Sequence, residues 1–243
     1  MNQQQPETYV PDETDAFCRS RILLGETVLR RLQAARVCVC GLGGVGSYVA
    51  EALARGGVGH IRLIDCDVVA ASNINRQLCA LTSSVGRLKT AVVAERLAQI
   101  HPQTEIERQE VFIRPENAAG LIAGCDYVLD AIDFLPGKIG LIAESGKSSI
   151  PIVSAMGAAN RLHPEKLRLA DISQTHTCPL ARVMRRELKK QGIVKGVPVV
   201  FSEEIPQKTG GDGAPLGSVS FVPGAMGLIM AGKAIRDIGG IED

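Results

Sequence analysis

The sequence predicts an α/β protein with a Rossmann-like, mostly parallel sheet that carries helices on both faces. Short apolar runs alternate with amphipathic stretches from about residue 37 to residue 155. The first run, Val37–Cys40, leads directly into Gly41, Gly43 and Gly46 at G-x-G-x-x-G spacing, and a second apolar run ends at Asp65. This order is typical of a nucleotide-binding βαβ unit, in which a strand is followed by a glycine turn, a helix, a second strand and an acidic residue.

The first elements follow from apolar spacing and from the glycine turn. Helical spacing predicts a helix over Phe17–Leu32, and the polar residues 1–16 are expected to form a flexible tail. After the strand Val37–Cys40, the glycines open a helix over Val45–Arg55, because they let the backbone turn sharply. The apolar run His60–Ile64 is predicted to be the second strand.

The middle of the chain continues the alternation. A polar loop or irregular helix is expected over Ser72–Leu81. Proline at a first helical turn favours the start of a helix, and proline shortly after a helix favours its end. On these signals and on apolar spacing, further helices are predicted over Gly86–Ile100, Pro115–Ala123 and Leu141–Lys147, and further strands over Glu105–Phe112, Tyr127–Ala131 and Ile150–Ala155.

Beyond Gly157 the alternation becomes less regular. Strands are expected over Leu167–Asp171, Val197–Ser202 and Ser218–Phe221, and helices over Pro179–Gln191 and Pro223–Ile238. The glycine-rich segment Gln207–Gly217 is expected to be mobile. Because no stretch resembles a linker, residues 17–243 are predicted to form a single domain.

Composition narrows the class of protein. The formal net charge of +1 gives no overall attraction to nucleic acid or to a membrane surface, and no apolar stretch approaches the roughly 20 residues that span a bilayer. The polar, acidic start does not resemble a signal peptide. Strand alternation predicts that Cys38 and Cys40 point the same way into a packed face. The seven cysteines include no Cys-x-x-Cys pair, which favours reduced thiols over a zinc site or a disulfide framework. A cytoplasmic protein is therefore expected.

Polar residues after the glycine turn favour ATP over NAD. Each could be structural alone, but the set has a consistent order: Gly41, Gly43, Gly44 and Gly46, then Asp65 and Asp67, then Asn73 and Arg76, then Lys89, then Asp133. Adenylation of a carboxylate moves negative charge among phosphate oxygens, so it requires fixed cations and a magnesium ligand. An NAD dehydrogenase has no use for two additional cations and a further acid at these positions.

On these motifs the chain resembles the ubiquitin-activating-enzyme superfamily, whose prokaryotic members include the ThiF and MoeB activators of sulfur-carrier proteins. The resemblance implies the ThiF/MoeB-type adenylating fold and an ATP site. It assigns Asp65 to the ribose hydroxyls. It implies that Asn73 and Arg76 contact phosphate oxygens, that Lys89 contacts the terminal phosphates, and that Asp133 binds magnesium. The other residues that it implies contact the nucleotide are Gly41, Gly43, Gly44, Gly46 and Asp67.

The resemblance also implies a homodimer. In this superfamily an arginine of the N-terminal helix reaches the ATP of the partner subunit. Arg19 matches that arginine, and Arg21 is a close competitor for the same role.

The second half of the chain indicates which branch of the superfamily this chain resembles. The sulfur-carrier activators typically hold zinc with two Cys-x-x-Cys pairs, which this chain lacks, so no zinc is expected. Three motifs of this half lie in residues 171–188, 200–204 and 217–223. They resemble the branch of tRNA threonylcarbamoyladenosine dehydratases, with Cys178 at a position where that branch commonly has an aspartate. Cys178 is interpreted as a packing or capping residue.

This branch implies an ATP-dependent cyclisation. The threonine carboxylate of threonylcarbamoyladenosine, next to the tRNA anticodon, becomes an acyl adenylate, and the ureido group of the same nucleoside closes a ring. A cysteine desulfurase or sulfur-acceptor system is a possible partner. Two alternative functions fit the same sequence. One is an adenylating activator of a ubiquitin-like sulfur carrier, and the other is a non-catalytic nucleotide-binding or NAD-sensing module.

A basic helix offers a surface for tRNA. The cationic side chains recur at helical spacing between residues 180 and 196, with a single acid among them. The residues expected to meet tRNA phosphates are Arg182, Arg185, Arg186, Lys189 and Lys190. A merely solvated charged face is the alternative interpretation.

Overall fold

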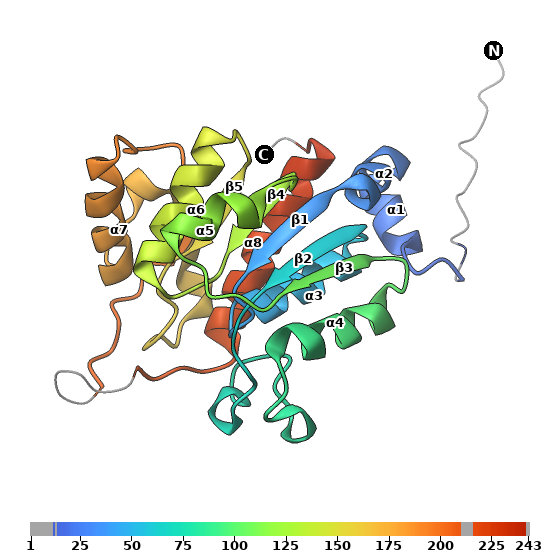
Figure 1. The fold of residues 1–243 in the computed structure, drawn as a ribbon, viewed down its shortest axis with the longest axis horizontal. Helices are drawn as coiled ribbons and strands as arrows, with labels where there is room; N and C mark the ends of the chain where they lie inside the picture. Colours follow the sequence, from blue (N-terminus) through green and yellow to red (C-terminus); the bar gives the residue numbers. More distant parts are fainter. Residues whose placement is uncertain (1–11, 13, 210–215, 242–243) are drawn as a thin grey trace, which may run out of the picture.

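A seven-stranded sheet forms the centre of the computed structural model, which describes residues 12, 14–209 and 216–241 (Figure 1). The strand order is β3-β2-β1-β4-β5-β7-β6, and β6 is antiparallel to β7 while the other neighbours are parallel. The strands are β1 (Arg36–Cys40), β2 (His60–Ile64), β3 (Glu105–Gln109), β4 (Tyr127–Asp130), β5 (Ile152–Ala155), β6 (Leu167–Asp171) and β7 (Pro198–Ser202). This confirms the predicted Rossmann-like fold class.

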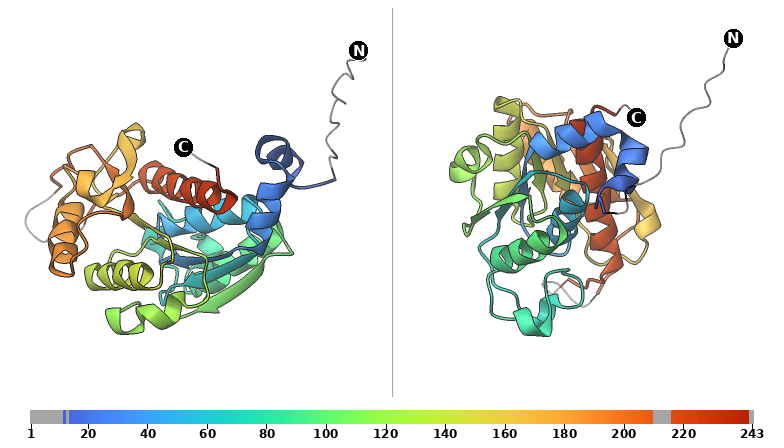
Figure 2. Two further views of the ribbon diagram at one scale, coloured as in Figure 1. Left: turned by 90° about the horizontal axis from the view of Figure 1, so that it is seen from above. Right: turned by 90° about the vertical axis from the view of Figure 1, so that its right-hand side faces the viewer.

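Helices cover both faces of the sheet (Figure 2). One face is covered by α2 (Glu26–Ala34), α3 (Gly46–Arg55), α4 (Lys89–Ile100) and α8 (Phe221–Gly239). The other face is covered by α5 (Pro115–Ile122), α6 (Leu135–Lys147) and α7 (Pro179–Lys190). The short helix α1 (Cys18–Leu24) precedes α2.

The alternation of side chains along each strand separates two apolar cores. In β1, Val37 and Val39 face the core under α3 and α8, whereas Cys38 and Cys40 face the core under α5 and α6. The Sγ atoms of Cys38 and Cys40 lie 3.6 Å apart and are fully buried. This confirms that the two cysteines point the same way into a packed face.

Several predicted boundaries are wrong for identifiable reasons. The helix predicted over residues 17–32 is broken at Gly25, whose φ of 81° is incompatible with a helix, so it forms α1 and α2. The strand predicted over Ser218–Phe221 does not form, because α8 already begins at Phe221 and the residues before it are irregular. Helix α4 begins at Lys89 rather than at Gly86, whose φ is 87°, and β3 ends at Gln109.

Helix α6 is longer than predicted because glycine and proline conceal its first two turns. It begins at Leu135, whereas the sequence predicted a start at Leu141. Gly137 and Gly140 allow close packing, since an added Cβ would lie 2.7 Å from the Ile113 carbonyl oxygen and 2.7 Å from Pro115 Cα, respectively. These glycines therefore bring α6 against the start of α5.

Glycines on the closing helix α8 have the packing role expected for isolated helical glycines. A Cβ at Gly227 would lie 2.5 Å from the carbonyl oxygen of Val45, and a Cβ at Gly224 would touch the Tyr48 ring. Helix α8 can therefore lie directly on α3. Among the described residues, no helix combines the length and the apolar character that crossing a membrane requires.

The predicted N-terminal tail lies largely outside the described part of the chain, which omits residues 1–11 and 13. The glycine-rich stretch 207–217 is described only up to residue 209 and from residue 216 onward.

A glycine substitution tests the close approach of Gly46 to the Gly41 carbonyl. We expect Gly46→Ala to lower the free energy of unfolding by about 3 kcal/mol or more, because its Cβ would lie 1.7 Å from the Gly41 carbonyl oxygen. The control is Gly120→Ala on α5, where nothing lies within 4 Å of the new methyl group. That control should be neutral or more stable by up to about 1 kcal/mol. Chemical denaturation measures both, and equal stabilities would contradict the close contact.

Candidate nucleotide-binding site

Three of the residues predicted to contact the nucleotide or its metal, Gly41, Asp65 and Asp133, follow strands at the carboxyl edge of the parallel sheet, whereas Arg19 on α1 and the predicted tRNA-contacting residues of α7 lie elsewhere. Strand β1 lies between β2 and β4, so the loops that follow β1 and β4 leave the sheet toward opposite faces. Open α/β sheets bind ligands in the crevice at such a point. Gly41 follows β1, Asp65 follows β2 and Asp133 follows β4, which brings three distant parts of the sequence together.

The glycine turn is shaped by backbone contacts. Gly41 has a φ of 86°, and its amide donates to the Ile64 carbonyl over 2.8 Å. Gly46 lies against the Gly41 carbonyl, so α3 begins directly behind the turn. At Gly43 the nearest atom to an added Cβ is Gln77 Nε2 at 3.9 Å, which leaves space above the turn. This space beside the positive end of the α3 dipole favours a phosphate group.

Gly44 has a different environment from the other turn glycines. An added Cβ there would lie 3.3 Å from Pro223 Cβ in the first turn of α8 and 3.4 Å from Arg76 Cγ. The structure therefore places Gly44 in a packing contact as well as in the turn predicted to bind the nucleotide.

Asp65 is fixed as an acceptor beside this turn. Its two oxygens accept from the amides of Leu42 at 2.7 Å and of Asp67 at 2.8 Å. Lys89, the first residue of α4, places Nζ 3.9 Å from Asp65 Oδ1 and 2.7 Å from Asp67 Oδ2. Burial raises the pKa of the Asp65 carboxyl, and the Lys89 ammonium group offsets part of that rise. The carboxyl group is therefore held in one orientation next to a buried cation.

The segment after β2 carries the predicted phosphate contacts. Asn73 Oδ1 accepts from the Ala70 amide at 3.0 Å and closes a short 3-10 turn. Arg76 Nη1 donates to the carbonyl oxygen of Ser72 and to Asn75 Oδ1, both at 2.9 Å. These contacts orient the guanidinium group while leaving further N–H donors for a ligand.

Ser47 joins this segment to the glycine turn. Its hydroxyl donates to the Gly43 carbonyl at 2.7 Å and accepts from the Leu78 amide at 3.1 Å. The glycine turn and the segment that carries Arg76 are thus one hydrogen-bonded unit, and the motif did not reveal this role of Ser47.

Asp133 is exposed and stands three residues beyond the end of β4. Its carboxylate has no hydrogen bond or ion pair within the described chain. Over that same range no three His, Cys, Asp or Glu residues form a cluster that could hold a metal. Magnesium commonly binds to one or two carboxylates plus substrate phosphates, so an unpaired acid at this edge fits a metal that arrives with a nucleotide.

Two further features of the site were missed by the sequence analysis. Gln77 is buried, and its Oε1 has no hydrogen-bond partner among the described residues, so a ligand above Gly43 could satisfy it. Phe112 and Phe134 are partly exposed with ring centroids 5.0 Å apart, and the Arg114 guanidinium lies 4.9 Å from the Phe112 ring centroid. Phe134 directly follows Asp133, which is the only signal the sequence offered.

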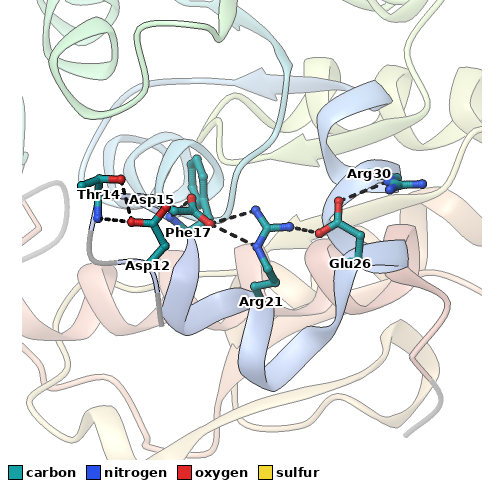
Figure 3. Close-up of polar contacts among 7 residues, drawn as sticks. All are labelled: Asp12, Thr14, Asp15, Phe17, Arg21, Glu26 and Arg30. Atoms are coloured by element: carbon teal, nitrogen blue, oxygen red, sulfur yellow. Dashed lines mark hydrogen bonds and ion pairs between the residues drawn. The ribbon is translucent and has the colours of Figure 1, made fainter. Parts of the chain in front are cut away.

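The N-terminal arginines Arg19 and Arg21 differ in what they contact, and Figure 3 shows the contacts of Arg21. Arg21 donates to Asp15 at 2.9 Å and also pairs with Glu26. Arg19 is exposed and has no partner within the described chain. Helix α1, which contains both, lies at the amino-terminal end of β1, whereas the glycine turn lies at the other end (Figure 1).

The basic helix α7 lies at the opposite end of the molecule from α1 in both figures of the fold (Figure 2). Arg182, Arg186, Lys189 and Lys190 are exposed, and Glu187 pairs with both Arg186 and Lys190. Arg185 instead turns inward to the backbone carbonyl and the hydroxyl of Thr175. The exposed basic face therefore lacks one of its five predicted members.

Cys178 precedes α7 and is buried, with 2% of its surface exposed. Its Sγ would lie 3.5 Å from a Cβ at Gly157. The position supports the packing interpretation of this cysteine.

Known proteins resemble this chain over most of its length. The tRNA threonylcarbamoyladenosine dehydratase of Bacillus subtilis is 43% identical over 238 residues, which cover 91% of this chain and 94% of that protein. A sulfur carrier protein adenylyltransferase of Thermus thermophilus is 35% identical over 130 residues, 53% of this chain and 48% of that protein.

Solved structures give the same result. The E. coli tRNA N6-threonylcarbamoyladenosine dehydratase TcdA in complex with AMP matches with a TM-score of 0.87 and 36% identity, covering 96% of this chain and 98% of that chain. Its complex with ATP matches with the same TM-score and coverage at 35% identity. A model of the ThiF family matches residues 17–243, and the chain therefore belongs to the ThiF family.

Proposed function

We propose that this chain is an ATP-dependent tRNA threonylcarbamoyladenosine dehydratase that cyclises the modified adenosine next to the anticodon. The observation that carries the proposal is the 43% identity to a dehydratase over more than nine tenths of both chains. The sulfur-carrier adenylyltransferase matches only about half of this chain, so it supports the alternative function less.

The reaction divides into two substitutions. The threonine carboxylate attacks the α-phosphorus of ATP, pyrophosphate leaves, and an acyl adenylate forms. The ureido group of the same nucleoside then attacks the acyl carbon, loses its proton, and expels AMP, which carries away the oxygen that the substrate loses. The ring closure needs no enzyme nucleophile, because both reacting groups belong to one nucleoside and have a high effective concentration.

The site supplies what the first substitution requires. Asp65 would accept from the ribose hydroxyls, while Arg76 and Lys89 would offset the charge of the phosphates and Asn73 would donate to them. Gly41, Gly43 and the start of α3 leave room for the phosphate backbone. Asp133 would hold Mg²⁺, which, when bound, neutralises charge on the departing pyrophosphate.

The direct experiment incubates the protein with ATP, Mg²⁺ and threonylcarbamoylated tRNA, followed by digestion and mass spectrometry of the nucleosides. An ATP-dependent loss of one water from the modified adenosine supports the proposal. An unchanged mass, together with pyrophosphate release that depends on a small protein with a diglycine C-terminus, would favour a sulfur-carrier activator. Tight binding of NAD without ATP turnover would contradict both.

The proposed substrate also favours a cytoplasmic location. A cysteine desulfurase or sulfur-acceptor partner stays a prediction, since the cyclisation itself transfers no sulfur.

The metal-binding role of Asp133 predicts a selective loss of turnover. We expect Asp133→Asn to lower the rate of cyclisation by about 100-fold, because transition-state charge on the phosphates loses its counter-ion. The melting temperature should stay unchanged, since the carboxylate has no partner within the described residues. Glu116→Gln, an exposed acid on α5, is the matched control. Full turnover by Asp133→Asn would contradict the assignment.

A homodimer in which Arg19 serves the partner subunit is part of the proposal. It is supported by the free side chain of Arg19 and by the position of α1 away from the glycine turn of its own chain. Arg21 is already paired with Asp15 and Glu26, which favours Arg19 for this role.

Mixing two inactive variants tests this arrangement. Arg19→Ala and Asp133→Asn should each lose turnover, and an equal mixture after subunit exchange should recover about one quarter of wild-type activity, because half of the dimers contain one intact site. Arg21→Ala should mainly lower stability. If the mixture stays inactive although subunits exchange, Arg19 does not act across a dimer.

The exposed basic face of α7 is proposed to contact tRNA phosphates. We expect the double substitution of Arg182 and Lys189 by Glu to weaken tRNA binding by about tenfold near physiological salt and to flatten its salt dependence, with ATP binding unchanged. The matched control replaces Arg30 and Lys147 by Glu, because these side chains are also cationic and are 75% and 71% exposed. A filter-binding series in salt measures both, and equal affinities would remove this face from the interface.

A further inference from the structure

A buried ion pair lies directly behind the nucleotide-facing edge of the sheet. Lys138 Nζ of α6 is 2.8 Å from Asp130 Oδ2 at the end of β4, and both side chains have 0% exposure. The hydroxyl of Ser154 on β5 also donates to Asp130 Oδ2, at 2.5 Å. Burying two charges costs solvation free energy, and a well-packed apolar pair is often as stable. The pair therefore requires an explanation beyond stability.

The pair holds both backbone polar groups of one residue, Ile132, and so fixes the two peptide groups that flank it. Asp130 Oδ1 accepts from the Ile132 amide at 3.2 Å, and Lys138 Nζ donates to the Ile132 carbonyl at 3.0 Å. Ile132 immediately precedes Asp133. Its side chain also packs against the glycine turn, since Ile132 Cγ2 would lie 2.9 Å from a Cβ at Gly41. The backbone next to Asp133 is thus fixed at its N–H, at its C=O and by packing.

We propose that Lys138 and Asp130 are positioning residues, which aim the Asp133 carboxylate at the phosphate-bound Mg²⁺ by fixing the backbone of Ile132 on both sides. The inference rests on the proposed function of Asp133. An exposed carboxylate without a partner within the described chain has no contact of its own to orient it, so its direction depends on the backbone that carries it. Groups that orient a metal ligand commonly affect metal affinity strongly.

Three variants separate positioning from stability. Lys138→Met keeps the shape of the side chain but removes the donor to the Ile132 carbonyl. Asp130→Asn keeps an acceptor for the Ile132 amide. The double variant Lys138→Met with Asp130→Asn removes both charges together, so no buried charge is left unpaired. Tyr127→Phe is the matched control, because it breaks the 2.6 Å hydrogen bond from the buried Tyr127 hydroxyl to Asp237 at the other end of β4.

The measurements are ATP affinity by titration calorimetry with and without Mg²⁺, and the melting temperature. In the wild type, Mg²⁺ should strengthen ATP binding. In Lys138→Met that gain should fall by about tenfold. The double variant should have a higher melting temperature than Lys138→Met, because no buried charge is left unpaired. Its ATP affinity should still increase less with Mg²⁺ than that of the wild type. Tyr127→Phe should lower the melting temperature and retain the gain in full.

Two results would overturn the inference in distinguishable ways. If Lys138→Met keeps the wild-type response to Mg²⁺, or if the double variant recovers it along with stability, the pair has only a structural role while the proposed function stands. If the wild type gains no ATP affinity from Mg²⁺ and Asp133→Asn behaves identically, the proposed metal site itself is wrong, and the inference falls with it.

Discussion

The close approach of α3 to the end of β1 determines the geometry of the site. Gly46 lies so near the Gly41 carbonyl that no side chain fits between them. This contact brings the start of α3 to the carboxyl edge of the sheet and leaves the space above Gly43 open. Asp65 then reaches the same turn by accepting from Leu42, and Ser47 ties the turn to the segment that carries Arg76. The glycine contact and these hydrogen bonds therefore fix the same turn from several sides.

The two halves of the sheet differ in the charged groups that lie beside them. The half formed by β1, β2 and β4 holds charge at its edge, with Lys89 between two acids and Lys138 sealed against Asp130. The other half ends in the antiparallel pair of β6 and β7, next to the basic helix α7. In the proposed function, the first half would handle the nucleotide and the second would face the tRNA.

Much of the fold could be predicted because apolar runs and glycine spacing are local signals. The strands from β1 to β5 were anticipated, and Cys38 and Cys40 face one core as expected. Errors arose where local signals misled: Gly25 breaks a helix that apolar spacing extended, and Gly137 conceals the start of α6 because its role is a contact with Ile113. The predicted single domain over residues 17–243 stays a prediction.

For the site, residue types were more predictable than their surroundings. The order of acids and cations in the sequence predicted Asp65, Lys89 and Asp133 as candidate site residues, because the charge of a side chain follows from its residue type. The roles of Lys138 and Gln77 were not, because burial and an unpaired oxygen are properties of the folded chain. Likewise, nothing in helical spacing distinguishes Arg185, which turns toward Thr175, from its exposed neighbours.

The contacts between the nucleotide-facing segment and the end of the chain affect the order of folding. Asn75 donates to the Ser218 carbonyl at 3.0 Å, and Pro223 lies against Gly44. Contacts between residues so far apart in sequence form only after long loops have closed, which makes them late events in folding. On the ribosome, the glycine turn and β2 emerge well before α8. The candidate nucleotide site would therefore be complete only after α8 has been synthesised and has packed on α3.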